Sequence, residues 1–511
     1  MDANKPLVII DKLNDTWIQV NTDDKEVLTA ISEKFTFYSD AAKFSTNKYW
    51  DGKIRLFKKR ERLLNIGLFP YLKSYLEHLG CVVQSDYNYT EGIREDITKL
   101  ALNFVKENPV HLNGNRIFPY KDQIKAFIQS IVEPKGITLS PTSSGKSLII
   151  YLQTQYIKEN FPNSKTLVVF PTTTLIEQMV GDFVEYANND TMESDIQKIY
   201  GFKGSTTEVQ KNLVFSTWQS ICDQDPEYFE QFDAVIVDEC HGGEAKNMKK
   251  ILELSVNSLF KRGYTGTLKE TKLHKLVLVG VFGRAYESIT YKELREQGRI
   301  SDCVIKVHQI GYKKDERKIV HKMNYQEEMM YIGEHLGRNK YLTSLMDSLS
   351  GNKLILFQRI ENHGHIMRDS FIQYAKDNGL DPENVYYVDG KTKTESRNQV
   401  RDIVEKKNGV VILASYQTFS TGINIKNLQH VVLGSPYKSK IKILQSIGRG
   451  LRKDGKENEV EIHDIVDDFS MGLSKLNYSM NQFNSRLKTY CSMEFLVQLI
   501  SADIKYGVDG V

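Results

Sequence analysis

The segment Ser140-Pro-Thr-Ser-Ser-Gly-Lys-Ser147 follows a short apolar run, residues 136–139, and precedes a stretch with helical character. It matches the pattern GxxxxGK[ST], except that Ser140 stands in place of the first glycine. Backbone N–H groups at the start of a helix bind phosphate oxygens. Gly145 would allow the backbone to approach the phosphates closely. Lys146 would contact the β- and γ-phosphates, and Ser147 would bind Mg²⁺. We therefore expect a strand–loop–helix unit that binds a nucleoside triphosphate, with further nucleotide contacts from Pro141, Thr142, Ser143 and Ser144.

A second segment, Ala234-Val-Ile-Val-Asp-Glu-Cys-His241, ends an apolar run in two adjacent carboxylates. Ligands bind at the carboxyl ends of strands in open α/β sheets. We expect Asp238 to hold Mg²⁺ and Glu239 to orient or deprotonate a water molecule. Cys240 and His241 follow, but no second pair of metal-ligand residues lies nearby in the sequence, so no metal site is predicted there.

Short apolar runs alternate with helical stretches on both sides of residue 300, a rhythm that indicates parallel sheets covered on both faces. The sequence thus predicts an α/β protein with two tandem doubly wound parallel-sheet domains. Residues 1–90 read as a small α+β domain, 91–117 as a helix followed by a loop-like linker, 118–300 and 301–470 as the two sheet domains, and 471–511 as a helical extension. The first domain's strands are expected at 136–139, 166–170, 212–216, 234–237 and 262–264. Those of the second are expected at 304–310, 353–358, 384–388, 409–414, 430–433 and 459–465.

Composition limits the classes of protein to which the chain can belong. It has 511 residues, with 68 Lys and Arg against 65 Asp and Glu, and a net charge of +3. This balance excludes a histone-like polycation but not a local nucleic-acid-binding patch. The N-terminus does not resemble a signal peptide, and no apolar run approaches the roughly 20 residues that span a bilayer. Five scattered cysteines without a CxxC pair suggest a soluble protein of a reducing compartment.

Two stretches carry concentrated positive charge. Residues 43–62 hold eight Lys or Arg against two acids, and residues 437–453 hold six with no acid. The first stretch is interleaved with Phe44, Tyr49, Trp50 and Phe57, a composition suited to phosphates and stacked bases; a solvated strand face is the alternative. Its candidate nucleic-acid contacts are Tyr49, Trp50, Lys53, Arg55, Lys58, Lys59 and Arg60.

The second basic stretch contains Gln445-Ser-Ile-Gly-Arg-Gly-Leu-Arg452. On a helix, Arg449 and Arg452 would share one face, and guanidinium groups suit the oxygens of a transferring phosphoryl group. The alternative is a solvated basic helix face.

Taken together, segments between residues 118 and 468 resemble the ordered motifs of superfamily 2 helicases, whose two sheet domains are RecA-like. The resemblance implies ATP and Mg²⁺ as cofactors, with ATP between the two domains. It implies catalytic roles for Lys146, Asp238, Glu239, Gln445, Arg449 and Arg452, and metal ligation by Ser147 and Asp238. It implies nucleotide contacts at Tyr120, Gln123, Gly422 and Asn424 besides the loop of residues 141–147. It implies nucleic-acid contacts at Pro171, Thr172, Thr173, Thr217, Trp218, Gln358, Ser415 and Thr418, and coupling of hydrolysis to movement by His241, Thr265 and Thr267.

The resemblance extends to recombination and repair helicases of T4-like bacteriophages. Asn47-Lys-Tyr-Trp-Asp-Gly-Lys-Ile-Arg-Leu56, Leu63-Leu-Asn-Ile-Gly-Leu68 and Asp464-Ile-Val-Asp-Asp468 carry it. It implies an ATP-dependent DNA helicase, a monomer in the host cytoplasm, that acts on forks, Holliday junctions, R-loops and single strands, with RNA as a partner in hybrids. An RNA helicase, a restriction-enzyme motor and an annealing protein with an inactive ATPase site are the alternatives.

Overall fold

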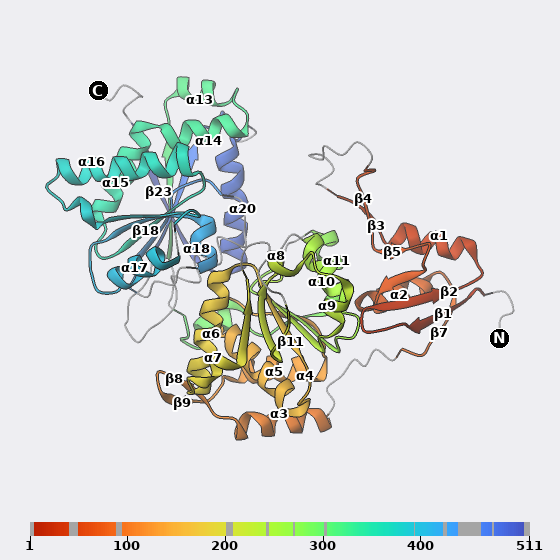
Figure 1. Ribbon diagram of the computed structural model, residues 1–511. Coiled ribbons are helices and arrows are strands. Elements are labelled where there is room, and N and C mark those ends of the chain that lie inside the picture. The colour runs from red at the N-terminus through yellow and green to blue at the C-terminus, as the bar shows by residue number, and fades with distance from the viewer. Residues whose placement is uncertain are drawn as a thin grey trace. The chain divides into compact units, whose positions relative to one another are not determined.

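The structure, a computed structural model, describes residues 5–39, 50–87, 95–200, 208–241, 245–268, 271–300, 304–392, 394–422, 427–437, 461–472 and 475–504. The chain forms two compact units (Figure 1). The first contains residues 1–141 and 145–289, and the second contains residues 142–144 and 290–511. Each unit is described by itself below.

The N-terminal part of the first unit has a mixed five-stranded sheet of order β5-β6-β2-β1-β7. β1 and β7 are parallel, and the other pairs are antiparallel. Asp24 caps α1 by accepting hydrogen bonds from two backbone N–H groups of its first turn. The elements are β1 (Leu7–Lys12), β2 (Trp17–Asn21), α1 (Lys25–Lys34), β3 (Thr36–Tyr38), β4 (Lys53–Arg55), β5 (Phe57–Lys58), β6 (Leu63–Asn65), a 3₁₀ turn (Ile66–Leu68), α2 (Phe69–His78) and β7 (Val82–Ser85).

This sheet does not have a core of its own. Its buried side chains pack against Leu276, Val277 and Val279 of α11 (Lys272–Phe282). A charged contact adds to the apolar one, because Lys135 Nζ lies 2.5 Å from Asp15 Oδ1. The N-terminal sheet therefore shares its core with the parallel-sheet region that follows, and both belong to the first compact unit. The domain bounds predicted from the sequence stay a prediction.

The expected loop between residues 108 and 117 is instead a β-hairpin. After α3 (Glu95–Glu107), β8 (Val110–Leu112) pairs with β9 (Asn115–Ile117). Asn113 and Gly114 both have positive φ, of 51° and 72°. An Asn-Gly pair favours this two-residue turn, because its twist matches that of the strands it joins.

The rest of the first unit is a seven-stranded sheet of order β12-β13-β11-β14-β15-β10-β16, and all its strand pairs are parallel. Buried residues of α4, α5 and α6 cover one face, and those of α8 to α11 cover the other (Figure 1). The elements are α4 (Lys121–Val132), β10 (Lys135–Leu139), α5 (Lys146–Asn160), β11 (Thr166–Phe170), α6 (Thr173–Ala187), α7 (Thr191–Asp195), β12 (Ile196–Ile199), β13 (Leu213–Thr217), α8 (Trp218–Ile221), α9 (Pro226–Glu230), β14 (Ala234–Asp238), α10 (Ala245–Leu254), β15 (Phe260–Thr265), α11 and β16 (Ala285–Glu287).

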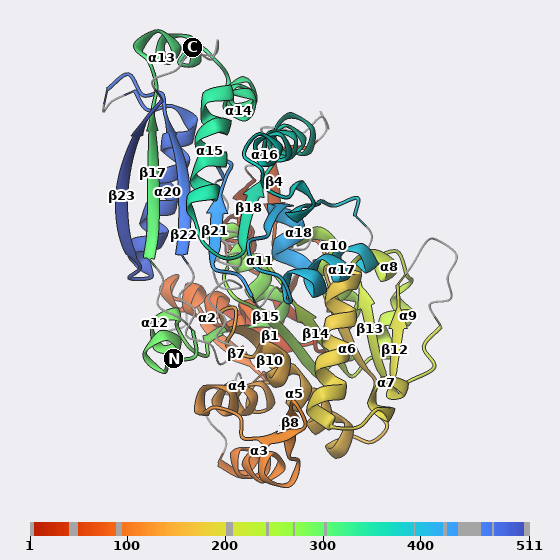
Figure 2. The ribbon, with the colours of Figure 1, turned by 90° about the vertical axis from the view of Figure 1, so that its left-hand side faces the viewer.

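The second unit contains a second all-parallel sheet of order β19-β20-β18-β21-β22-β17-β23 (Figure 2). The elements are α12 (Tyr291–Glu296), β17 (Val304–Gly311), α13 (Lys314–Val320), α14 (Tyr325–Glu334), α15 (Leu336–Ser348), β18 (Lys353–Phe357), a π-helical turn (Ile360–His365), α16 (Ile366–Asp377), a 3₁₀ turn (Pro382–Asn384), β19 (Val385–Val388), α17 (Thr394–Val404), β20 (Val411–Ser415), α18 (Tyr416–Gly422), β21 (His430–Leu433), β22 (Glu461–Asp468), α20 (Tyr478–Ser492) and β23 (Leu496–Asp503). Both sheets have the predicted doubly wound arrangement.

The sequence had suggested that the C-terminal extension is helical, but the structure shows that only part of it is. α20 is a helix, but β23 adds a strand to the edge of the second sheet by pairing with β17. Leu496 and Leu499 are 60% and 61% exposed, so the apolar residues of this strand do not mark a buried face. Two buried ion pairs anchor helices to β22: Arg486 of α20 binds Asp464, and Arg338 of α15 binds Asp467. Within the described residues, no helix is long and apolar enough to cross a membrane.

Candidate active site

The predicted functional segments of the first unit follow strands whose carboxyl ends lie at one edge of the sheet. The register pairs Leu139 with Thr265, Asp238 with Tyr264, and Phe170 with Thr217. Because parallel strands all point the same way, the loops after β10, β11, β13, β14 and β15 emerge together. The sheet therefore gathers segments that are more than 120 residues apart in the sequence.

The loop after β10 turns into α5 at the predicted phosphate-binding segment. Gly145, at the N-cap of α5, has φ 86°, and a Cβ atom there would collide with the side chain of Gln123. Ser140 is fully buried, and its backbone N–H donates a hydrogen bond of 2.9 Å to the carbonyl of Thr265. Ser140, which replaces the first glycine of the pattern, is therefore accommodated inside the sheet edge.

A chain of polar contacts joins the loop to the acidic segment and to the end of β15. The Lys146 ammonium donates to Glu239 Oε1 at 2.6 Å. His241 Nδ1 lies 3.1 Å from Glu239 Oε2 and 2.5 Å from Thr265 Oγ1. The Thr265 hydroxyl in turn donates to the carbonyl of Thr267 at 3.0 Å. All five residues were predicted from the sequence, and the structure brings them into one continuous network.

The two adjacent carboxylates have opposite pKa shifts. Burial, together with the negative charge of Glu239, raises the pKa of Asp238 to about 6. Burial also acts to raise the pKa of Glu239, but the positive charge of Lys146 and the hydrogen bond with His241 outweigh it and leave that pKa well below its usual value. Glu239 is thus a stable anion, whereas Asp238 carries a charge that its surroundings do not compensate.

The surroundings of Asp238 fit a divalent cation, which would compensate the buried carboxylate. Ser147, the second predicted metal ligand, shares a hydrogen bond of 2.9 Å with the hydroxyl of Tyr186 on α6. Tyr186 was not predicted, because it lies 39 residues away inside an ordinary amphipathic helix. Metal ligation by Ser147 and Asp238 stays a prediction.

The predicted nucleotide contacts Tyr120 and Gln123 lie at the start of α4. The amide oxygen of Gln123 accepts a hydrogen bond of 2.8 Å from the backbone N–H of Tyr120, which caps the helix. Gln123 is buried, and the Tyr120 side chain is 54% exposed. An exposed ring beside a fixed amide is suited to stacking and hydrogen bonding with a base.

Residues 142–144 of the phosphate-binding loop belong to the second unit, and two other residues of that unit contact them, although no motif predicted them. Arg299 Nη2 donates to the carbonyl of Ser144 at 2.7 Å, and the Tyr291 hydroxyl lies 3.4 Å from Thr142 Oγ1. Neither residue has a sequence signal, since each is a lone polar residue in or just after a short helix.

The predicted nucleic-acid contacts of the first unit lie at neighbouring strand ends. Thr172 caps α6 and accepts a hydrogen bond from the N–H of Leu175, with Pro171 just before it and Thr173 as the first helical residue. Gln219 bridges the two segments by donating to the carbonyl of Pro171 at 3.1 Å. Thr217, before the half-buried Trp218, shares a 2.8 Å hydrogen bond with Ser220.

In the second unit, local hydrogen bonds hold the predicted residues at the carboxyl ends of β18 and β20. The backbone N–H of Gln358 donates to Ser435 Oγ at 3.2 Å, and the hydroxyls of Ser415 and Thr418 lie 2.7 Å apart. Gly422 is the last residue of α18. Asn424, Gln445, Arg449 and Arg452 lie outside the described residues, as does nearly all of the second basic stretch.

The first basic stretch is only partly the aromatic and cationic surface that its composition suggested. Phe57 is 2% exposed and belongs to the core of the N-terminal sheet, so it cannot stack on a base. Lys58, Lys59 and Arg60 are exposed, and the Lys58 ammonium lies 3.9 Å from the centre of the Trp17 ring. The Trp50 indole N–H donates to the carbonyl of Lys53, and Arg55 pairs with Asp51. Phe44 and Tyr49 lie outside the described residues.

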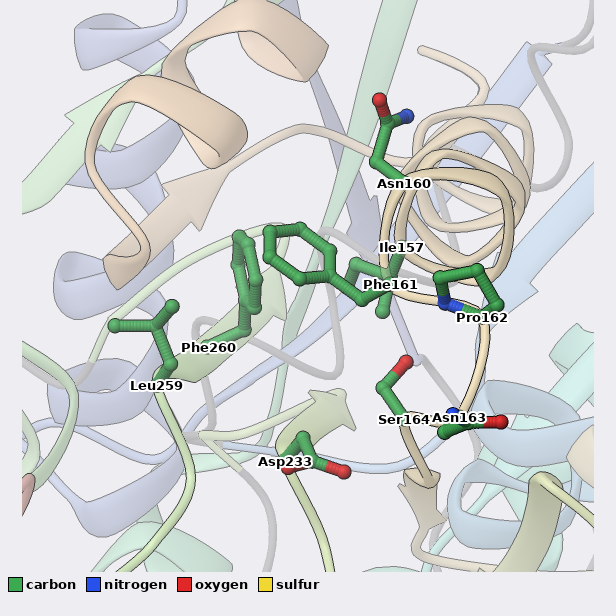
Figure 3. Close-up of a pocket in the computed structure, with 9 residues that line it drawn as sticks. All are labelled: Ile157, Asn160, Phe161, Pro162, Asn163, Ser164, Asp233, Leu259 and Phe260. Atoms are coloured by element: carbon green, nitrogen blue, oxygen red, sulfur yellow. The ribbon is translucent and has the colours of Figure 1, made fainter.

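A cavity of about 460 Å³ lies at the opposite, amino edge of the first sheet (Figure 3). Phe161 and Phe260 face each other in it, with ring centres 5.7 Å apart, and Asp233 and Ser164 lie opposite them. It is separated from Lys146 by the length of α5, so it is not part of the predicted nucleotide site.

Two parallel sheets, a phosphate-binding loop and an Asp-Glu-Cys-His segment define an ATP-dependent helicase with RecA-like domains. Family models agree: a model described as type III restriction enzyme, res subunit, matches residues 118–270, and a helicase conserved C-terminal domain matches residues 337–454. A fragment of a putative HsdR subunit of a type I restriction enzyme from Vibrio vulnificus shares the fold, with a TM-score of 0.57 over 88% of this chain and 78% of that one at 18% identity.

The chain belongs to the family of the ATP-dependent DNA helicase UvsW of Enterobacteria phage T4. It is 33% identical to that protein over 483 residues, which cover 90% of this chain and 93% of UvsW. The crystal structure of T4 UvsW matches with a TM-score of 0.50 over 97% of this chain and 99% of that one, at 29% identity. Putative helicase 22 of a Sulfolobus islandicus filamentous virus is 25% identical over 71% of this chain and 67% of its own length.

Proposed function

We propose that this ATP-dependent DNA helicase is a translocase that remodels branched DNA by branch migration, regression of stalled forks and unwinding of R-loops. The observation that carries the proposal is the network from Lys146 through Glu239 and His241 to Thr265. The network connects Lys146 and Glu239, which are expected to act on ATP, with Thr265 at the end of β15, which is expected to respond to hydrolysis. Such a connection suits a motor better than a passive binding protein.

The contacts suggest how the site changes when ATP arrives. Lys146 neutralises Glu239 in the structure, and the low pKa makes Glu239 a poor base in that state. When the Lys146 ammonium turns to the phosphates, Glu239 loses its main positive neighbour and its pKa rises. It can then accept a proton from the water that attacks the γ-phosphorus, with ADP as the leaving group. Mg²⁺, held by Asp238 and Ser147, would neutralise charge on the phosphate oxygens.

His241 and Thr265 are placed to sense this change. Once Lys146 has left, His241 remains the contact that holds the second oxygen of Glu239. A movement of the Glu239 carboxylate therefore shifts His241, which contacts the hydroxyl of Thr265. That hydroxyl in turn donates to the carbonyl of Thr267. We assign to these three residues the coupling of hydrolysis to domain movement. Arg449 and Arg452 are assigned to the γ-phosphate from the sequence alone.

Two observations support DNA as the substrate: the similarity to T4 UvsW and the exposed positive charge in the N-terminal part of the chain. T4 UvsW is named a DNA helicase, and the likeness to it includes the N-terminal part of the chain, where Lys58, Lys59 and Arg60 are exposed. An RNA helicase is the alternative, since a 25% identical relative from Acanthamoeba polyphaga mimivirus is named a putative ATP-dependent RNA helicase.

A strand-displacement assay on a forked DNA and on an RNA duplex of the same sequence tests the proposal. We expect ATP-dependent displacement of the DNA strand and little of the RNA strand. Displacement of RNA alone would replace the proposal with the RNA helicase alternative, and phosphate release unaffected by either would indicate a protein that is not a nucleic-acid motor.

A further inference from the structure

A second cluster of ligand-type side chains lies in the second unit, at the amino edge of its sheet. β21 starts at His430 and β22 starts at Glu461, and these two residues are paired in the register. His463, two residues further along β22, is on the same face as Glu461 because side chains alternate along a strand. The functional segments of this unit follow the carboxyl ends of β18 and β20, at the other edge of the same sheet.

Three donor atoms of this cluster converge on one point. His430 Nδ1 lies 3.3 Å from His463 Nε2 and 3.4 Å from Glu461 Oε2, and His463 Nε2 lies 3.5 Å from the same oxygen. Tetrahedral zinc, with ligand distances of about 2.0–2.2 Å, holds its ligand atoms about 3.3–3.6 Å apart. The triangle is therefore already the size of one face of a zinc tetrahedron.

Surrounding contacts orient two of the three donors, His463 and Glu461. His463 Nδ1 lies 3.0 Å from His308 Nε2, and His308 Nδ1 lies 2.7 Å from the hydroxyl of Tyr341 on α15. A proton on His463 Nδ1 leaves its Nε2 lone pair pointing at the centre of the triangle. Metal-binding histidines usually have such an outer partner. On the third ligand, Lys306 Nζ donates to Glu461 Oε1 at 2.6 Å and leaves Oε2 for the centre.

Both imidazole rings of the cluster are buried. His463 is 1% exposed and His430 is 8% exposed. Burial, with the neighbouring imidazoles of His308 and His430, lowers the pKa of His463 to about 3, and burial also lowers the pKa of His430. Lys306 and Lys353 place positive charge nearby, which opposes any cation, so coordination by the two imidazole nitrogens must supply the main attraction.

We propose that His430, Glu461 and His463 form a binding site for a divalent transition-metal ion, with Zn²⁺ as the best fit. Two imidazoles and one carboxylate leave a fourth position for water or another ligand. The site lies at the edge of the sheet away from the residues assigned to nucleic acid and nucleotide, so its role is structural. The bound ion holds the first residues of β21 and β22 together. The segment that connects these two strands contains Gln445, Arg449 and Arg452.

Metal stoichiometry of the full-length chain tests the site. The chelator-treated protein, without nucleotide, is given Zn²⁺, passed through a desalting column and analysed by mass spectrometry for bound metal. We expect one Zn²⁺ per chain, and we expect Co²⁺ to give the visible spectrum of a tetrahedral site without a thiolate charge-transfer band. Zn²⁺ should also raise the melting temperature of the chelated protein.

Variants locate the ion. His430→Gln should lose stoichiometric retention, and Glu461→Gln, whose side chain is 32% exposed and tolerant of change, should bind Zn²⁺ at least tenfold more weakly. The exposed His321→Gln and the nucleotide-site Asp238→Asn serve as controls that should retain the metal. A wild-type protein that retains no Zn²⁺, a Co²⁺ spectrum with thiolate bands, or equal retention by Glu461→Gln and His321→Gln would each overturn the proposal.

Discussion

The ammonium of Lys146 lies 2.6 Å from a carboxylate oxygen of Glu239, and both side chains are largely buried. The two residues are 93 positions apart, yet the parallel register of β10, β15 and β14 brings them together. A buried pair of this kind is strongly affected when either partner is removed, because the other charge is left without compensation. Several predictions about activity rest on this relationship.

Replacing Lys146 should abolish turnover. Lys146→Ala removes the charge assigned to the β- and γ-phosphates, and the loss of one preorganised donor lowers kcat by roughly 10²–10³-fold or more. The measurement is steady-state phosphate release with saturating DNA. Lys158→Ala, on the same helix but exposed and paired with Asp195, is the matched control and should retain activity. Strand displacement by Lys146→Ala would refute the assignment of the loop.

Asp238→Asn should stabilise the nucleotide-free protein at alkaline pH. Because the pKa of Asp238 is raised from 3.8 to about 6, the folded protein holds the proton more tightly than the unfolded chain. Ionisation therefore costs stability, and this cost grows as the pH rises from about 4 to about 6 and is full above that. At roughly 1.4 kcal/mol per pKa unit, the gain is on the order of 1–3 kcal/mol at pH 8. Thermal melts at pH 5 and pH 8 measure it.

The gain in melting temperature from Asp238→Asn should be larger at pH 8 than at pH 5. An equal gain at both pH values, or a loss at pH 8, would show that the buried charge is already compensated. ATP hydrolysis by this variant should be lost, because the carboxylate assigned to Mg²⁺ is gone.

Thr265→Val should separate hydrolysis from unwinding. The substitution keeps the volume of the side chain but removes the hydroxyl that contacts His241 Nδ1 at 2.5 Å. We expect DNA-stimulated ATP hydrolysis within about tenfold of wild type and a much smaller number of base pairs opened per ATP. Ser288→Ala, which removes a hydroxyl that donates to the carbonyl of Leu139 at the same sheet edge, is the control. Hydrolysis and unwinding that fall by the same factor would argue against a coupling role.

Charge reversal of Lys58, Lys59 and Arg60 should weaken binding to forked DNA and reduce its dependence on salt. Each lost phosphate contact lowers the slope of log Kd against log salt by about one. Reversal of Lys314, Lys318 and Lys322, three lysines of or just after α13, is the control for nonspecific charge. If the two triple variants have the same salt slope, the first basic stretch does not contact the fork.

Arg452→Ala should still bind ATP and DNA but hydrolyse ATP roughly 10³–10⁵-fold more slowly, as is typical when an arginine that stabilises the transferring phosphoryl group is lost. Binding of a fluorescent nucleotide and of DNA, measured beside turnover, distinguishes this outcome from misfolding. Lys453→Ala, the adjacent basic residue, should behave as wild type. Unchanged DNA-stimulated turnover in Arg452→Ala would contradict the role assigned from the sequence.

How far the fold could be predicted depended on where each strand lies in its sheet. Central strands such as Thr166–Phe170 and His430–Leu433 are apolar on both faces and were predicted to the residue. Of the four edge strands of the two parallel sheets, β19 was predicted, but β12, β16 and β23 were missed, because a strand with one free edge does not need a continuous apolar run. β23 even has exposed leucines, which mimic a helical pattern.

The candidate sites show the same limit. Lys146, Asp238 and Glu239 have residue types and spacings that point to chemistry without a structure. Tyr186 and Arg299 contact the same loop through single hydrogen bonds that no motif records. His430, Glu461 and His463 are ordinary residues in the sequence, and only the pairing of β21 with β22 shows that their donor atoms converge.

The measurement that tests the central claim most directly is ATP hydrolysis by the wild-type chain in the presence of single-stranded, duplex and forked DNA, an RNA–DNA hybrid and RNA alone. A DNA-remodelling motor should hydrolyse ATP slowly by itself and be stimulated most strongly by forked DNA, with Lys146→Ala inactive on every substrate. Equal hydrolysis with and without nucleic acid, or stimulation by RNA alone, would contradict the account.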